Sequence, residues 1–129
     1  MIITVKTVAF SGCTGLRRIT LSKDTVVEGG SYGQSGFPRD INIKVHFTGT
    51  LADWCDEATR IDTLSNSYSL YVMHNNAEKP VTQIPLQGTE LSDIVYIRDH
   101  AFQNCKSFKE FHHYFAKSIT HFGKYAFAD

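Results

Sequence analysis

The chain has 129 residues, 42% of them hydrophobic, which predicts one folded domain with a continuous core. Its 13 basic and 13 acidic side chains give a formal net charge of zero, which argues against nucleic acid or an anionic membrane as the partner. No apolar run approaches the length of a membrane helix, and residues 1–10 lack the features of a signal peptide. We therefore expect no membrane insertion and no secretion signal within this chain.

One sequence frame occurs near both ends of the chain. Its first copy reads IITVKTVAF over residues 2–10 and AFSGCTGLRRITL over residues 9–21, and its second copy reads AFQNCKSFKEF over residues 101–111 and ITHFGKYAF over residues 119–127. The alignment pairs Phe10 with Phe102 and Cys13 with Cys105. Apolar residues whose spacing changes within one unit fit neither a long helix nor a long strand. They fit a chain that turns once per repeat and buries its apolar positions against the next turn.

This frame resembles the BspA-like leucine-rich repeats, in which Ala-Phe-x-x-Cys-x-x-Leu is followed by a short strand and by Ile-Gly-x-x-Ala-Phe. Phe102 and Phe127 are 25 residues apart, a distance within the leucine-rich-repeat range. The first copy departs from the family because Lys6 and Thr7 stand where the second copy has Gly123 and Lys124, so the first copy lacks the turn glycine. The resemblance implies a leucine-rich-repeat solenoid, built mainly of short β-strands and turns with little helix.

The first strand is predicted over residues 16–21, directly after the first copy of the frame. Its pattern places Leu16, Ile19 and Leu21 inward and leaves Arg18 and Thr20 exposed on the sheet face. Residues 25–39 then fit the frame as a degenerate repeat, although their glycines also permit a plain loop.

A second strand is predicted over residues 41–47, where apolar and polar residues alternate. Ile41, Ile43, Val45 and Phe47 should share one buried face of this strand. The clean alternation indicates a sheet that is buried on one side and exposed on the other.

The segment that begins GTLADW at Gly49 resembles one found in some family members, where a helical turn and a β-hairpin interrupt a repeat. We therefore expect a hairpin insertion over residues 49–86, with strands at 64–72 and 81–86 and a tip at 74–80. In this hairpin Tyr68, Leu70 and Val72 should share one face, and Tyr71 and Met73 should share the other.

The second copy of the frame leads from Ala101 into a predicted strand over residues 108–113, whose outward positions are Glu110 and His112. The chain begins and stops in mid-repeat, and neither end shows the polar cap that a terminal coil of a solenoid needs. We expect the single domain, residues 1–129, to be a fragment of a longer repeat array. Self-association through the uncapped repeat ends is the alternative.

The three cysteines cannot form a complete set of disulfides, and Cys13 and Cys105 fit buried core positions. Cys55 lies outside the frame, and a reactive thiolate there would need a cationic neighbour. Its charged neighbours in sequence are acidic, which favours a packed thiol beside Trp54. A small thiol-dependent enzyme that uses Cys55 is the less favoured alternative.

Metal binding is also disfavoured, although the chain has six histidines. His112 and His113 are adjacent on a predicted strand and so point to opposite faces, and no cysteine or carboxylate stands at a recognisable ligand spacing. We interpret Asp53 and Asp56 as part of a solvated face near the start of a helix, rather than as a catalytic pair of carboxylates. We expect no metal ion and no cofactor.

A binding surface is the remaining hypothesis, because a row of short strands presents an extended outward face. The candidate partner-binding residues are Arg18, Thr20, Glu110, His112 and Trp54, although for Trp54 a packing role is favoured over partner binding. The resemblance implies non-catalytic protein or surface recognition by an adhesion or interaction module, with a protein or glycan partner at a surface. It also implies an extracellular or cell-surface location, and a structural spacer within a longer array is the alternative function.

Overall fold

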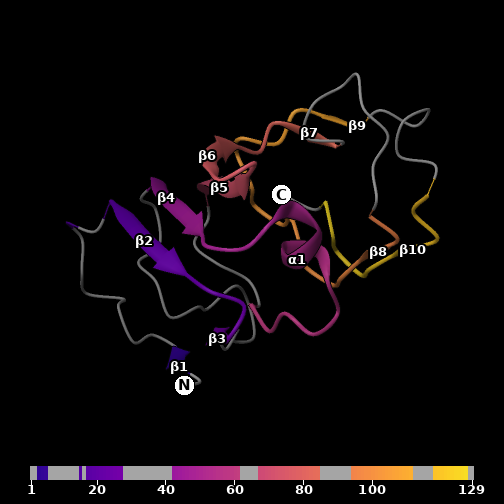
Figure 1. Ribbon diagram of the computed structural model, residues 1–129, viewed down its shortest axis with the longest axis horizontal. Coiled ribbons are helices and arrows are strands. Elements are labelled where there is room, and N and C mark those ends of the chain that lie inside the picture. Colours follow the sequence, from indigo (N-terminus) through magenta and orange to yellow (C-terminus); the bar gives the residue numbers. More distant parts are fainter. Residues whose placement is uncertain are drawn as a thin grey trace.

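A computed structural model describes residues 3–5, 15, 17–27, 42–61, 67–84, 94–111 and 118–127. Within these ranges the chain forms mainly short β-strands and a single five-residue helix, α1 (Leu51–Cys55) (Figure 1). This confirms the prediction of short strands with little helix. None of the helical structure in the described ranges is long and apolar enough to cross a membrane.

The largest sheet has four strands in the order β2-β4-β5-β6. These are β2 (Arg18–Leu21), β4 (Asn42–Phe47), β5 (Ser67–His74) and β6 (Ala77–Pro80). The first three are parallel, and β6 runs antiparallel to β5. In Figure 1 this sheet lies on the opposite side of α1 from β8 and β10.

Three further parallel pairs complete the described strands. They join β1 (Ile3–Val5) to β3 (Thr25–Val27), β7 (Gln83–Ile84) to β9 (Glu110–Phe111), and β8 (Tyr96–Ile97) to β10 (His121–Phe122). Paired residues are 22 apart in β1–β3, 26 in β2–β4, 25 in β4–β5, 27 in β7–β9 and 25 in β8–β10. A new parallel neighbour is therefore added at about the repeat length that Phe102 and Phe127 predict.

The alternation in β4 and β2 places their apolar residues in the core. Ile43, Val45 and Phe47 are buried, which confirms the predicted face, while Ile41 lies outside the described residues. In β2, Leu21 is buried and Ile19 packs against the core as a partly buried residue, and Arg18 and Thr20 are exposed as predicted. Leu16 lies outside the described residues.

The hairpin of β5 and β6 has the predicted faces but a tighter tip. Tyr68, Leu70 and Val72 are buried, whereas Tyr71 and Met73 are half-buried, so the predicted assignment of these side chains to two faces is confirmed. The predicted tip over residues 74–80 and second strand over 81–86 are wrong in extent, because β6 occupies residues 77–80. The two turn residues, Asn75 and Asn76, have φ angles of 51° and 64°, and asparagine tolerates this left-handed conformation better than most residues.

Residues 25–27 form the strand β3 rather than a loop. This strand also contacts a later part of the chain through the parallel bridge between Val27 and Ile61. The rest of the predicted degenerate repeat, residues 28–39, lies outside the described residues. In the second copy of the frame, Ala101 and Phe102 are buried and Cys105 packs against the core, as predicted. Phe10 and Cys13 lie outside the described residues.

Helix α1 begins at a capping box. The Thr50 side chain accepts a hydrogen bond from the Asp53 backbone amide, and the Asp53 carboxylate accepts one from the Thr50 amide. Leu51, Trp54 and Cys55 face the core. The predicted helical turn after Gly49 and the position of Asp53 near its start are therefore confirmed.

Candidate functional site

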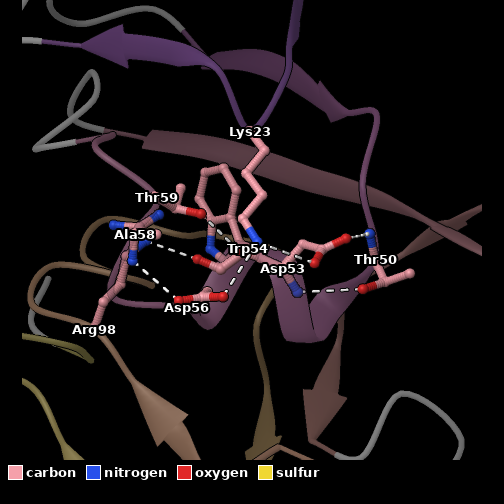
Figure 2. Close-up of polar contacts among 8 residues, drawn as sticks. All are labelled: Lys23, Thr50, Asp53, Trp54, Asp56, Ala58, Thr59 and Arg98. Carbon is pink, nitrogen blue, oxygen red and sulfur yellow. Dashed lines mark hydrogen bonds and ion pairs between the residues drawn. The ribbon is translucent and has the colours of Figure 1, made fainter.

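Trp54 and Arg98 form the polar centre of the interior (Figure 2). The Arg98 guanidinium is buried, and its carbon lies 4.7 Å from the centre of the Trp54 ring. Arg98 Nε donates to the Trp54 carbonyl at 2.7 Å, and Nη1 donates to the Ile61 carbonyl at 2.7 Å. The Trp54 indole donates to the Ala101 carbonyl at 2.7 Å. These bonds join α1 to the second copy of the frame, so their role is to hold the scaffold together.

Two acidic residues of the helix region, Asp53 in the first turn of α1 and Asp56 at its C-cap, face solvent and contact the same lysine. Lys23 Nζ lies 3.5 Å from Asp53 Oδ1 and 3.2 Å from Asp56 Oδ2 (Figure 2). The hydrogen bond that the Ala58 amide donates, together with the Lys23 hydrogen bond, lowers the pKa of the Asp56 carboxyl. Both carboxylates are thus engaged in local contacts, as expected for a solvated helix end rather than a catalytic pair.

Cys55 is fully buried between the helix and the core. Burial raises the pKa of its thiol to about 12, although the nearby Arg98 charge acts in the opposite direction. The thiol is therefore protonated at neutral pH and has no route to a substrate. This confirms the prediction of a packed thiol beside Trp54.

The side of the four-stranded sheet that faces away from the core carries two rows of polar side chains. We call these six residues the outer sheet face: Arg18, Lys44 and Ser69 in the first row, and Thr20, His46 and Tyr71 in the second. Each row crosses β2, β4 and β5 in register, and the residues alternate with buried core positions. The rows therefore form one continuous surface across three parallel strands.

A carboxylate from the hairpin reaches the outer sheet face. Glu78 on β6 places its Oε1 atom 3.3 Å from Arg18 Nη1 and 3.2 Å from His46 Nδ1. The hydrogen bond from Arg18 is the main cause of the lowered pKa of Glu78. Because arginine is always charged, the contact between Arg18 and Glu78 is an ion pair at neutral pH.

A depression of about 390 Å³ adjoins the first row. It is lined by Arg17, Arg18, Ile43, Lys44 and Ser69. Three of these five side chains are cationic, which makes the depression locally basic although the whole chain has no formal net charge.

The structure separates the predicted contact residues. Arg18 and Thr20 lie together on β2, but Glu110 lies on β9, which pairs with β7 in a different sheet. His112 lies outside the described residues. Trp54 is fully buried, so its ring is not available to a partner, and its assignment as a contact residue is corrected to a packing role.

Four outer-face residues were missed by the sequence reasoning: Lys44, His46, Ser69 and Tyr71. The signal for Lys44 and His46 was present, because they alternate with the buried positions of the strand predicted over residues 41–47. The sequence did not show that β2, β4 and β5 are neighbours in register, and this pairing is what joins their polar residues into rows. Across the described ranges, no three metal-ligating side chains lie close enough together to hold an ion.

Comparison with known families identifies the repeats. Residues 78–129 match the family described as the BspA type leucine rich repeat region, with six copies in its model. These residues carry BspA-type leucine-rich repeats. The matched range includes the second copy of the frame and β6 to β10. No curated protein and no solved structure matches the chain.

The match over residues 78–129 suggests a protein-interaction or recognition module, and the family is generally non-catalytic. Proteins with repeats of this type are typically located at a surface or outside the cell. The match over residues 78–129 is compatible with such a location. The outer sheet face, which has Arg18 and Thr20 on its edge strand β2, precedes the matched range in the sequence.

Proposed function

We propose that this chain is an adhesion or interaction module that binds a protein or glycan at a cell or matrix surface through the outer sheet face. The observation that carries the proposal is the pair of polar rows, Arg18–Lys44–Ser69 and Thr20–His46–Tyr71, in register across three parallel strands. An extended polar face of this kind suits recognition of a large partner, because the paired strands fix the spacing of its side chains before binding.

The proposal includes a solenoid arrangement of the repeats within one domain, residues 1–129, interrupted by the hairpin insertion over residues 49–86. The near-constant separation of parallel partners supports the solenoid. The antiparallel β6 strand, which departs from this parallel pattern, supports the insertion. The proposed location is the cell surface or the extracellular space.

Two other functions are less well supported. A thiol-dependent enzyme would need an accessible thiolate at Cys55, but that side chain is buried and its pKa is raised. Thiol labelling of the native protein tests this point, and rapid modification of Cys55 would support the hypothesis of a thiol-dependent enzyme. A structural spacer predicts that the outer sheet face binds nothing, which the following experiment addresses.

Binding of the purified chain to an array of matrix proteins, mucins and glycans tests the proposal. The test variant changes three exposed residues of the outer sheet face to alanine: Arg18, Thr20 and Lys44. The matched control changes three exposed residues elsewhere, also two cations and one threonine: Lys79, Thr82 and Lys109. We expect saturable binding that is lost in the test variant and kept in the control. Binding that both variants keep, or its absence from the whole array, would contradict the proposal.

A further inference from the structure

The basic depression beside the first row brings three cationic side chains and a hydroxyl group together. Arg17, Arg18 and Lys44 line it together with the Ser69 hydroxyl. Among these cations, Arg18 is bound by Glu78, whereas Lys44 is exposed and has no ion pair within the described part of the chain. The site therefore carries positive charge that its described surroundings do not neutralise.

The cations lie on adjacent strands. Arg18 and Lys44 are partners in the β2–β4 register, and parallel strands are separated by about 4.8 Å. The parallel bridge between Tyr68 and Cys105 extends this side of the sheet, and in that register the exposed Lys106 follows alongside Ser69. A ligand with repeated anionic groups can thus contact several cations, while a single small anion would gain little from exposed charges.

The rest of the outer sheet face favours a sugar over a peptide. Its six side chains offer hydroxyl, amine, guanidinium, imidazole and phenol groups, and none of them is aliphatic. The buried centre of a protein–protein interface is usually more apolar than its rim and is depleted in charged residues. Hydroxyl groups and the half-buried Tyr71 ring suit the hydroxyls and ring faces of a carbohydrate instead.

We propose that the depression lined by Arg17, Arg18, Lys44 and Ser69 binds the sulfate groups of a sulfated glycan, with the second row contacting the adjoining sugar. Arginine pairs with such anions through two parallel N–H bonds, and lysine acts as a compact point charge. This inference rests on the proposed function, because it names the ligand of the same face.

The test uses a heparin oligosaccharide as the probe, with the fully desulfated oligosaccharide and polyglutamate as comparisons. Binding to the intact chain is measured by calorimetry at two salt concentrations. We expect heparin to bind, with an affinity that falls as salt rises, and the desulfated form and polyglutamate to bind at least tenfold more weakly. Lys44→Gln should weaken heparin binding about fivefold.

Lys79→Gln is the matched control. Lys79 is also exposed and carries the same charge, but it is paired in register with the buried Val72 and so lies on the other side of the sheet. It should change the affinity less than twofold. Equal thermal melts of both variants would show that neither substitution disturbs folding.

Three results would overturn the inference. Polyglutamate binding as tight as heparin would assign the depression to acidic peptides, and equal losses in the two lysine variants would place the heparin contact elsewhere. Absence of heparin binding at low salt would exclude a sulfated glycan as the ligand of the depression. If that last result accompanied binding of an array protein that required Arg18, Thr20 and Lys44, the proposed function would stand and the glycan inference alone would fail.

Discussion

At the scale of single residues, Gly123 is required by a close approach of two backbone segments. A Cβ atom at this position would lie 2.3 Å from the Arg98 carbonyl carbon and 2.3 Å from the Asp99 nitrogen, both backbone atoms. The Gly123 amide also donates to the Ile97 carbonyl at 2.7 Å, which joins β10 to β8. The turn glycine noted in the repeat frame therefore serves contact between neighbouring repeats.

Gly123→Ala should lower the free energy of unfolding by more than about 2 kcal/mol, because the backbone must move to admit the methyl group. Urea denaturation measures this effect. Gly15→Ala is the control, because no atom of the described residues lies within 4 Å of the added methyl group, and it should change stability by less than about 0.5 kcal/mol. Similar small changes in both variants would mean that the repeats do not approach each other this closely.

The buried Cys55 thiol should make the stability of the fold decrease at alkaline pH. Because the folded-state pKa is raised to about 12, the unfolded chain loses this proton first as the pH rises. The contribution to stability is thus complete below the ordinary thiol pKa and is lost between pH about 9 and 12, by about 1.4 kcal/mol per pH unit. Burial raises the pKa values of Cys105 and Tyr68 as well, so they act in the same direction.

Urea denaturation at pH 8, 9 and 10 should show a steeper loss of stability in the native sequence than in Cys55→Ala. The comparison uses the slopes with pH, because the alanine variant is also destabilised at every pH by the cavity it leaves. Equal slopes would show that the Cys55 thiol ionises as readily in the folded protein as in the unfolded chain.

At the scale of elements, the β5–β6 turn is built from two residues with positive φ, Asn75 and Asn76. Glycine adopts this conformation without strain, and a β-branched residue adopts it poorly. Asn76→Gly should keep or raise stability by up to about 1 kcal/mol, whereas Asn76→Val should lower it by more than about 1 kcal/mol. Thermal denaturation followed by circular dichroism measures both changes. Equal melting temperatures in the two variants would contradict the two-residue turn.

The elements that could be predicted were those whose local pattern decides their structure. Alternation gave the buried faces of β4 and β5, and the Gly49–Trp54 segment gave the helical turn, because burial and capping act over a few neighbouring residues. The hairpin tip was placed too broadly, because two asparagines in a turn look like the middle of a longer loop. The ion pair between Arg18 and Glu78 joins residues 60 apart, and local patterns carry no information on such a contact.

The candidate site was predicted in part for the same reason. Arg18 and Thr20 were placed on an outward face from their own strand alone. Joining them to Lys44 and Tyr71 required the parallel register of three strands. Separating them from Glu110 required the knowledge that β6 pairs with β5, whereas β7 pairs with β9 in another sheet. The repeat frame described how one turn of the chain folds, while the pairing of turns decided which polar residues meet.

At the scale of the whole molecule, an aromatic patch remains uncovered beside the second copy of the frame. Phe122, Tyr125 and Phe127 are 53%, 57% and 41% exposed, and the Phe122 and Phe127 rings are 6.5 Å apart. Phe127 also stacks at 5.5 Å on Phe102, which is buried in the core. The patch is therefore continuous with the core, as expected for a repeat whose apolar face is normally covered by a neighbour.

We expect this patch to drive reversible self-association of the isolated chain, because a second copy would remove its aromatic surface from water. Sedimentation velocity over a hundredfold range of concentration should show a growing dimer fraction in the native sequence. Phe122→Asp should keep the chain monomeric over that range, because the new carboxylate would be desolvated in the contact. Thr20→Asp adds the same charge at an exposed position on the outer sheet face and should leave the association unchanged. A native chain that stays monomeric throughout, or an equal loss in both variants, would show that association does not use the aromatic patch.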